Sequence, residues 1–155
     1  MKCYISNSVL SKYFLSLLIF TVFVLSGCSV KLVADHDLKT YEEILRVGKS
    51  IDEFYGDLLE TPAESRKYKK YSEKYVKLES ELRSLYVRNK SRPLNEESTK
   101  ISESILKLWV KYKEKHKTKN SYKDGNAKLD RNKFVNIFIS AASAELAKNI
   151  EAAKK

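Results

Sequence analysis

Residues that build common catalytic and metal sites are scarce in this sequence of 155 residues. It contains two histidines, two cysteines and four glycines. It has no glycine-rich phosphate loop, no nucleophile elbow and no HExxH motif, which excludes the usual sequence signatures of catalytic sites. We therefore predict that the protein is not an enzyme and that it binds no metal ion.

Neither histidine is predicted to be a metal ligand. Asp35-His36-Asp37 contains three potential ligands, but adjacent residues rarely converge on one ion, so helix capping and solvation explain them better. His116 lies in a run of lysines that would repel a bound cation, and we expect it on the surface. The lysines concerned are Lys113, Lys115, Lys117 and Lys119.

Acidic residues are absent from the first 27 positions, which carry Lys2, Lys12 and an apolar run over residues 13–25. A charged start, an apolar middle and a small-residue finish are typical of an export signal. The apolar run is shorter than the roughly 20 residues that a membrane-spanning helix needs. The sequence thus predicts a cleaved signal peptide over residues 1–27.

The end of this segment, Leu25-Ser26-Gly27-Cys28, resembles the lipobox of bacterial lipoproteins. The resemblance implies cleavage after Gly27 and transfer of diacylglycerol to the Cys28 sulfur, often with acylation of the new amino group. Because Ser29 follows, it implies the outer membrane in a Gram-negative cell. In a Gram-positive cell the same anchor implies the outer face of the plasma membrane. No cofactor is expected beyond this covalent lipid.

Export limits the partners that the protein can meet. Removal of residues 1–27 takes away two lysines and no acidic residue, so the net charge falls from +10 to +8. A basic charge often indicates nucleic-acid binding, but an exported domain does not meet cytoplasmic DNA. We expect anionic membrane surfaces, envelope polymers or envelope proteins instead. Cys3 leaves with the signal, so Cys28 can form no intrachain disulfide and the domain depends on its core.

Residues 28–36 show no helical period and are predicted to be a tether, whereas residues 37–155 are predicted to be one all-α domain. Short connections near Thr61 and Pro93 favour an antiparallel up-and-down bundle of about four helices. The last helix is apolar on most sides and is expected to be the most buried. The predicted helices cover residues 37–60, 61–89, 95 to at least 112, and 130–153, with a turn at Asp124-Gly125-Asn126 between the last two.

Local signals refine these helices. Asp37 or Thr40 can cap the first helix, in which Gly48 would allow a neighbouring helix to approach closely. Thr61-Pro62-Ala63-Glu64 has the pattern of a helix start, so we predict that the second helix begins there. The apolar seam of that helix is Tyr68, Tyr71, Tyr75, Leu78, Leu82 and Leu85. Lysines between its three tyrosines leave sugar or phosphate binding open, but core packing is the favoured interpretation.

Glu145 is the one charged side chain that the pattern places among core residues. At about 100° per residue it lies between Phe134 and Phe138 on the apolar face of the last helix. A carboxylate there must pair, take up a proton, or lie where the bundle opens. We favour a structural pairing with a lysine, arginine or tyrosine over a functional site.

The function that these features favour is a non-enzymatic helical adaptor, anchored by lipid, that binds another envelope protein. In size, anchor and helix content it is similar to pilotin-like assembly factors and to the entry-exclusion lipoproteins of mobile elements. Trp109 is the candidate partner contact, although a place in the core is the favoured interpretation for this residue. The alternative function is a basic binder of envelope polymers, either lipopolysaccharide or peptidoglycan.

Overall fold

The computed structural model of the protein describes residues 32–153, so the predicted signal peptide, Gly27 and Cys28 lie outside the described residues. The described part is a bundle of four long α-helices, and its helices contain no stretch long and apolar enough to cross a membrane. This confirms the predicted all-α fold. The helices are α2 (Leu38–Glu60), α3 (Tyr68–Lys90), α4 (Glu96–Lys119) and α5 (Asp124–Ala153).

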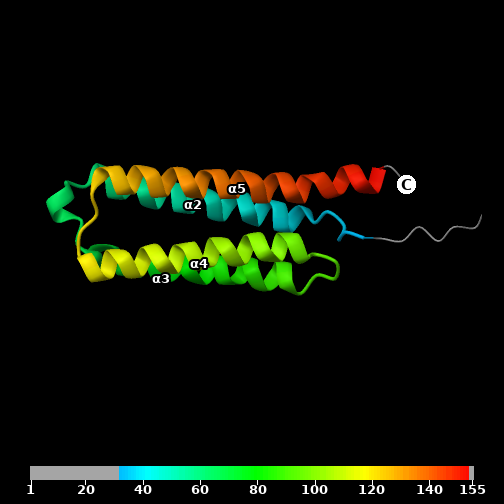
Figure 1. The fold of residues 1–155 in the computed structure, drawn as a ribbon, viewed down its shortest axis with the longest axis horizontal. Coiled ribbons are helices and arrows are strands. Elements are labelled where there is room, and N and C mark those ends of the chain that lie inside the picture. The colour runs from blue at the N-terminus through cyan, green and yellow to red at the C-terminus, as the bar shows by residue number, and fades with distance from the viewer. Residues whose placement is uncertain (1–31, 154–155) are drawn as a thin grey trace, which may run out of the picture. The chain divides into compact units, whose positions relative to one another are not determined.

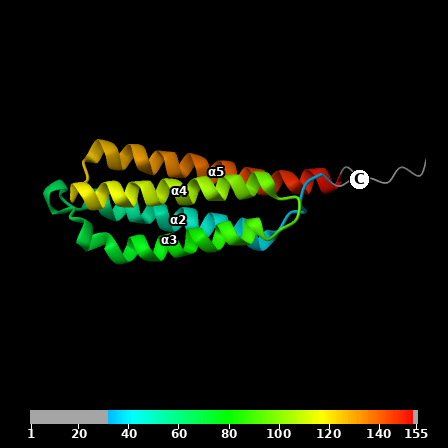
Figure 2. The same ribbon diagram turned by 60° about the horizontal axis from the view of Figure 1, so that its bottom comes forward.

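Successive helices run in opposite directions and pack side by side (Figure 1). The most extensive packing pairs α2 with α5 and α3 with α4, whereas α2 with α3 and α4 with α5 touch less. The view in Figure 2 shows that all four helices extend along one common axis. One end of the bundle therefore carries the start of α2, the loop between α3 and α4, and the last turns of α5.

The start of α2 is set by Asp37 rather than by Thr40. The Asp37 carboxylate accepts hydrogen bonds from the Lys39 backbone N–H at 3.0 Å and from the Thr40 hydroxyl at 2.8 Å. Further along α2, a Cβ atom at Gly48 would lie only 3.1–3.3 Å from atoms of Phe138 in α5. The missing side chain at Gly48 thus allows α5 to approach α2 closely, as predicted.

The prediction that the second helix begins at Thr61-Pro62 is wrong. That segment forms only a short 3₁₀ turn, η1 (Ala63–Ser65), and α3 begins at Tyr68. The reason is Arg66, whose buried guanidinium donates hydrogen bonds to the carbonyl oxygens of Leu59 and Thr61 at 3.1 and 2.7 Å. These carbonyls belong to the end of α2, where no helical partner remains for them.

The remainder of α3 follows the predicted seam. Its members are buried, except for Tyr68, which is half-buried at the start of the helix. Tyr75 packs with aromatic rings from two other helices, at 4.7 Å from Phe54 and 5.1 Å from Trp109 between ring centroids. The tyrosines are therefore part of the core, as favoured from the sequence.

The predicted turn at Asp124-Gly125-Asn126 is also wrong, because these residues form the first turn of α5. The chain instead reverses at residues 120–123. Asn120 adopts a left-handed conformation with φ of 46°, and its side-chain oxygen accepts a hydrogen bond from the Tyr68 backbone N–H at 3.0 Å. One residue thus ends α4 and satisfies a free donor at the start of α3.

Within the described residues the last helix carries more buried residues than any other helix, as expected, but it is covered on one side only. One side of α5 packs on the core through Phe134 and Phe138. Its other side carries large apolar side chains that are exposed to solvent. These are Leu129, Val135, Ile139 and Leu146.

Candidate functional site

Trp109 is fully buried at the centre of the bundle, so it occupies the core position that the sequence favoured over a partner contact. Its indole N–H donates a hydrogen bond to the Tyr75 carbonyl oxygen at 3.2 Å. Phe54 and Phe134 pack against the ring with centroid distances of 5.1 and 5.7 Å. A partner could reach this ring only by unfolding the bundle.

His116 is buried as well, so its predicted surface position is wrong. One ring nitrogen, Nε2, lies 2.9 Å from the Arg66 carbonyl oxygen, and Nδ1 lies 3.1 Å from the Tyr75 hydroxyl. A neutral ring with its proton on Nε2 satisfies both contacts. Burial lowers the pKa of His116, and the hydrogen bond to the Arg66 carbonyl only partly opposes this shift. The residue links α4 to the turn before α3 and has no open side for a ligand.

Glu145 is completely buried near the end of α5 and lies in an ionic cluster. Its carboxylate accepts hydrogen bonds from Arg92 at 3.0 and 3.2 Å, from Lys148 at 2.5 Å and from the Asp37 backbone N–H at 2.8 Å. Burial raises the pKa of Glu145, but these donors outweigh it and hold the pKa below its usual value. Lys148 in turn donates to Asn95 and Ser98 in the bundle interior.

The same end of the bundle also binds the last residues of segment 28–36, which was predicted to be a tether. The Ala34 backbone N–H donates to the Leu94 carbonyl oxygen at 2.9 Å, and Ala34 is buried. Arg92 donates to the Asp35 carbonyl oxygen, and His36 Nδ1 lies 3.0 Å from the Glu145 carbonyl oxygen. The segment from residue 34 to residue 36 therefore lies against the end of the bundle. Within the described residues no three potential ligands come together to hold a metal ion.

A groove of about 400 Å³ runs along the surface between α2 and α5. Ile44, Phe138 and Ala142 form its buried floor, beside Gly48 of α2. Exposed apolar side chains stand along both walls: Leu45 on α2, and Val135, Ile139 and Leu146 on α5. At one point the groove is bridged by Arg131 of α5 and Asp52 of α2, whose side chains form two hydrogen bonds of 2.6 Å.

The exposed side of α5 beside this groove carries no charge. Residues 134–144 contain no charged residue, and the charges that follow, Glu145 and Lys148, are buried. In a chain of which 32% of residues are charged, a solvent-exposed helix face without charge is unusual. The cores of protein interfaces are depleted of charged residues in the same way. The exposed positions are Val135, Asn136, Ile139, Ser140, Ser143, Leu146, Ala147 and Asn149.

This surface was not predicted from the sequence, although its signal was present. Apolar residues on most sides of the last helix indicate burial against several other helices. A bundle of four helices covers only one side of each helix, so an all-round apolar pattern must leave part of α5 exposed. The run of residues 134–144, which contains no charged residue, was the signal that indicated the exposed part of α5.

Comparison with known proteins returns no match: no family model, no curated protein and no solved structure is similar to this chain.

Proposed function

We propose that this protein is a lipid-anchored adaptor of the bacterial cell envelope, and that the groove between α2 and α5 binds a helix of another envelope protein. The observation that carries the proposal is the exposed, charge-free and apolar strip of α5 along that groove. An apolar surface of this kind in an otherwise strongly charged molecule marks an interaction site. Most of the residues that line the groove are apolar, which fits a binding role.

The shape of the groove favours an amphipathic helix as the occupant. Two antiparallel helices form its walls, and a third helix can lie between them with its apolar side chains at positions i, i+3, i+4 and i+7. Small residues on the groove surface, namely Ala142 and Ser143, permit close approach of a helix backbone. Because the α5 strip is uncharged, binding there would depend on apolar burial and be insensitive to salt.

The test is photo-crosslinking in intact cells with a reactive amino acid placed at Ile139, which is exposed in the groove. The matched control carries the same group at Val76, which is exposed on α3. Capture of one discrete protein from position 139, but not from position 76, supports the adaptor. If the only protein captured is a second copy of this chain, the groove mediates self-association and the adaptor proposal is wrong.

A second variant pair tests whether the groove provides the affinity. Ile139→Lys should abolish capture without loss of stability, because the side chain is exposed, whereas Val76→Lys should leave capture intact. Thermal unfolding of both variants provides the stability control. Equal capture by the two variants would contradict the groove as the binding site.

The anchor is tested separately, by the mass of the mature protein isolated from cells. The resemblance of Leu25-Ser26-Gly27-Cys28 to the lipobox predicts a chain that begins at an acylated Cys28. With two or three acyl chains its release from the membrane would be negligible. Cys28→Ala should leave the precursor uncleaved or mislocalised. An unmodified Cys28, or an intact residue 1–27 segment in the wild type, would contradict the anchor.

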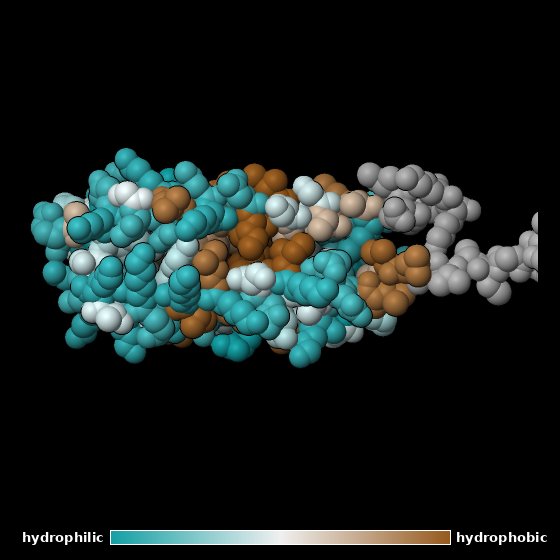
Figure 3. All heavy atoms as spheres, viewed as in Figure 1, coloured by the Kyte–Doolittle hydropathy of each residue, from teal (hydrophilic) through white to brown (hydrophobic). Residues whose placement is uncertain are grey.

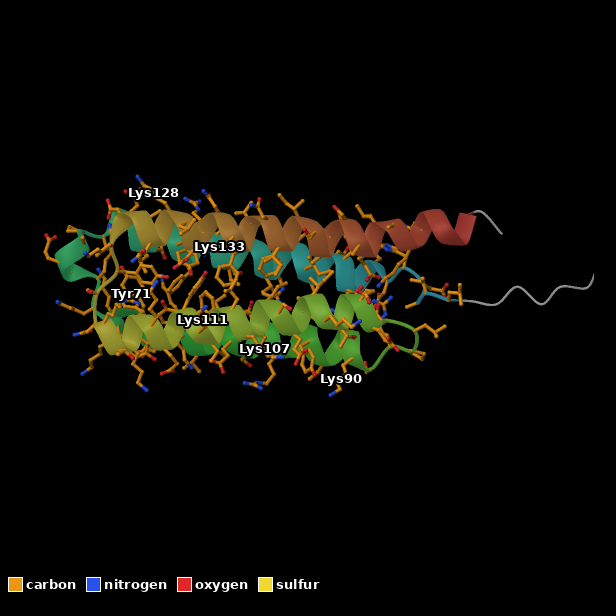
Figure 4. All side chains as sticks on the ribbon, viewed as in Figure 1. Tyr71, Lys90, Lys107, Lys111, Lys128 and Lys133 are labelled. Atoms are coloured by element: carbon orange, nitrogen blue, oxygen red, sulfur yellow. The ribbon has the colours of Figure 1, made fainter. Side chains whose placement is uncertain are left out.

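Binding of an anionic envelope polymer is the second candidate function, and the lysines of α4 and α5 favour it. Lys107 and Lys111 are exposed on α4, and Lys128 and Lys133 extend from the first turns of α5 (Figure 4). Together with a net charge of +10 for the whole chain, they can attract phosphate or carboxylate groups. Capture of lipopolysaccharide or peptidoglycan that is lost at high salt would favour this function over the adaptor.

A further inference from the structure

The end of the bundle where α2 begins exposes three large apolar side chains. Leu32 is 78% exposed, Leu94 is 51% exposed and Val33 is 42% exposed. All three line one shallow hollow of about 280 Å³, together with residues 95–98 and Lys148. Apolar atoms at this end are visible on the surface in Figure 3. The protein thus has an apolar tip, defined here as Leu32, Val33 and Leu94.

Leu94 reaches this tip in an unfavourable backbone conformation. Its φ of 58° lies in the left-handed region, which bulky residues rarely adopt. The conformation is held from both sides, since the Leu94 carbonyl accepts from the Ala34 N–H and the neighbouring Asn95 is bound to Lys148. Asparagine or glycine would fit the same turn more easily. A leucine that is strained and exposed suggests a role for its side chain outside the fold.

The chain leaves the bundle at this same tip. The contacts of Ala34, Asp35 and His36 with the bundle end fix the exit point next to Leu94. Only four peptide steps separate Leu32 from Cys28, and at about 3.3–3.6 Å per residue they span at most about 14 Å. If Cys28 carries lipid, as in the proposed function on which this step rests, Leu32 cannot lie farther than that from the membrane interface.

We infer that the apolar tip inserts into the interfacial region of the lipid bilayer, so that the bundle stands on the membrane through its own residues as well as through the anchor. The occupant of the tip is a lipid surface because the anchored part of the chain leads directly into it. Glu96 and Glu97 are exposed beside the hollow and Glu97 pairs with Lys100, so the hollow presents no excess of positive charge to anionic headgroups. The contact is therefore apolar and should withstand high salt.

The test uses the full chain, purified from cells in detergent and reconstituted into vesicles of phosphatidylethanolamine and phosphatidylglycerol. Cys3 is replaced by serine throughout. A nitroxide spin label is attached at Leu94→Cys or, as the matched control, at Ser121→Cys, which is exposed in the loop at the opposite end of the bundle. Collision with oxygen, which is concentrated in lipid, is compared with collision with a water-soluble nickel chelate.

We expect a several-fold rise in the ratio of oxygen to nickel collisions at position 94 on reconstitution, and no change at position 121. The rise should persist at high salt. A label at position 94 that stays as aqueous as the label at position 121 would overturn the inference. The mass of the same sample shows whether Cys28 is acylated. This measurement separates an incorrect lipid-anchor proposal from an incorrect inference about insertion of the apolar tip.

A second measurement guards against an effect of the label itself. With the label at Leu32→Cys, Leu94→Asn should lower the lipid exposure of the label while leaving thermal stability equal or higher, because asparagine tolerates positive φ. Leu129→Asn removes an equally exposed leucine near the other end of the bundle and should have no effect on the label. Equal effects of the two variants would overturn the role of Leu94.

Discussion

The guanidinium of Arg92, in the loop between α3 and α4, donates two hydrogen bonds to the carboxylate of Glu145 in α5, at 3.0 and 3.2 Å. The two residues are 53 positions apart in the sequence. The residues at the start of α2 bind to the same pair. The Asp37 backbone N–H donates to the Glu145 carboxylate, and the Asp35 carbonyl oxygen accepts from the Arg92 guanidinium. The pair therefore joins three chain segments at the end of the bundle where the chain enters.

Loss of the Glu145 charge should be strongly destabilising. Glu145→Gln leaves Arg92 and Lys148 without their buried counter-charge, and removal of one partner of a buried pair costs about 3–5 kcal/mol. Urea unfolding followed by circular dichroism measures the loss. Glu97→Gln is the control, because its ion pair with Lys100 is exposed and is worth at most about 1 kcal/mol. Similar losses for both variants would show that the buried cluster contributes no more than a surface pair.

Acid should destabilise the protein first through His116. Because burial lowers its pKa below the ordinary 6.5, the folded state binds the proton more weakly than the unfolded state does. The stability from this residue is fully present above pH 6.5 and is lost as the pH falls from there through the lower pKa of the folded state. Urea midpoints between about pH 7 and pH 5 should record the loss.

The variant His116→Gln should remove that part of the pH dependence. Lys117→Gln, an exposed neighbour on α4, should keep it. Glu145 acts in a separate and more acidic window, because its pKa is lowered from 4.5 and its contribution is lost only as the pH falls below that value. A wild-type midpoint that does not change from neutral pH down to about pH 5 would contradict the assignment to His116.

A charged substitution in α3 should destabilise the protein strongly only on the side of the helix that carries the seam. Leu82→Asp places a carboxylate in the core and should cost at least about 3 kcal/mol. Val76→Asp makes a comparable change at a side chain that is 63% exposed on the same helix, and should cost less than about 1 kcal/mol. Thermal unfolding distinguishes the two. If Leu82→Asp melts like Val76→Asp, the seam is not part of the core.

Trp109 is the single tryptophan and reports directly on the core. Since its ring is fully buried, its fluorescence in the native protein should be protected from iodide and acrylamide, and unfolding in urea should remove this protection. Trp109→Ala should cost about 3–5 kcal/mol. Because this variant is expected to be strongly destabilised, any loss of partner binding in Trp109→Ala would reflect unfolding and not a lost contact. Ready quenching of Trp109 fluorescence in the native protein would contradict its burial.

Helix content and the main core seams could be predicted from sequence because helical periodicity is a local signal. The spacing of Leu78, Leu82 and Leu85 places them on one side of any helix that contains them, whatever that helix packs against. The close approach at Gly48 was predictable for the same reason, and local residue types narrowed the cap of the first helix to Asp37 or Thr40. Signals of this kind need no knowledge of the neighbouring helices.

The helix boundaries at Thr61 and Asp124 could not be predicted in this way. Both depend on Arg66, whose guanidinium binds the end of α2, the Tyr122 carbonyl oxygen and the Asp124 carboxylate. The strong local start signal at Thr61-Pro62 is overridden because a buried guanidinium must find several acceptors at once. His116 was misplaced for a related reason: its neighbours in sequence are lysines, but its neighbours in space are tyrosine rings.

The sequence by itself determined that this protein is a bundle of amphipathic helices, because the period of its apolar residues is compatible with nothing else. Which apolar residues are covered was decided only by the tertiary structure. Four helices around one core leave an outer side on each of them, and on α5 that side carries Val135, Ile139 and Leu146. Trp109, in contrast, is buried at the centre of the bundle, because the largest apolar side chain gains the most free energy from complete burial. The groove and the apolar tip therefore exist only in three dimensions, where segments distant in sequence meet.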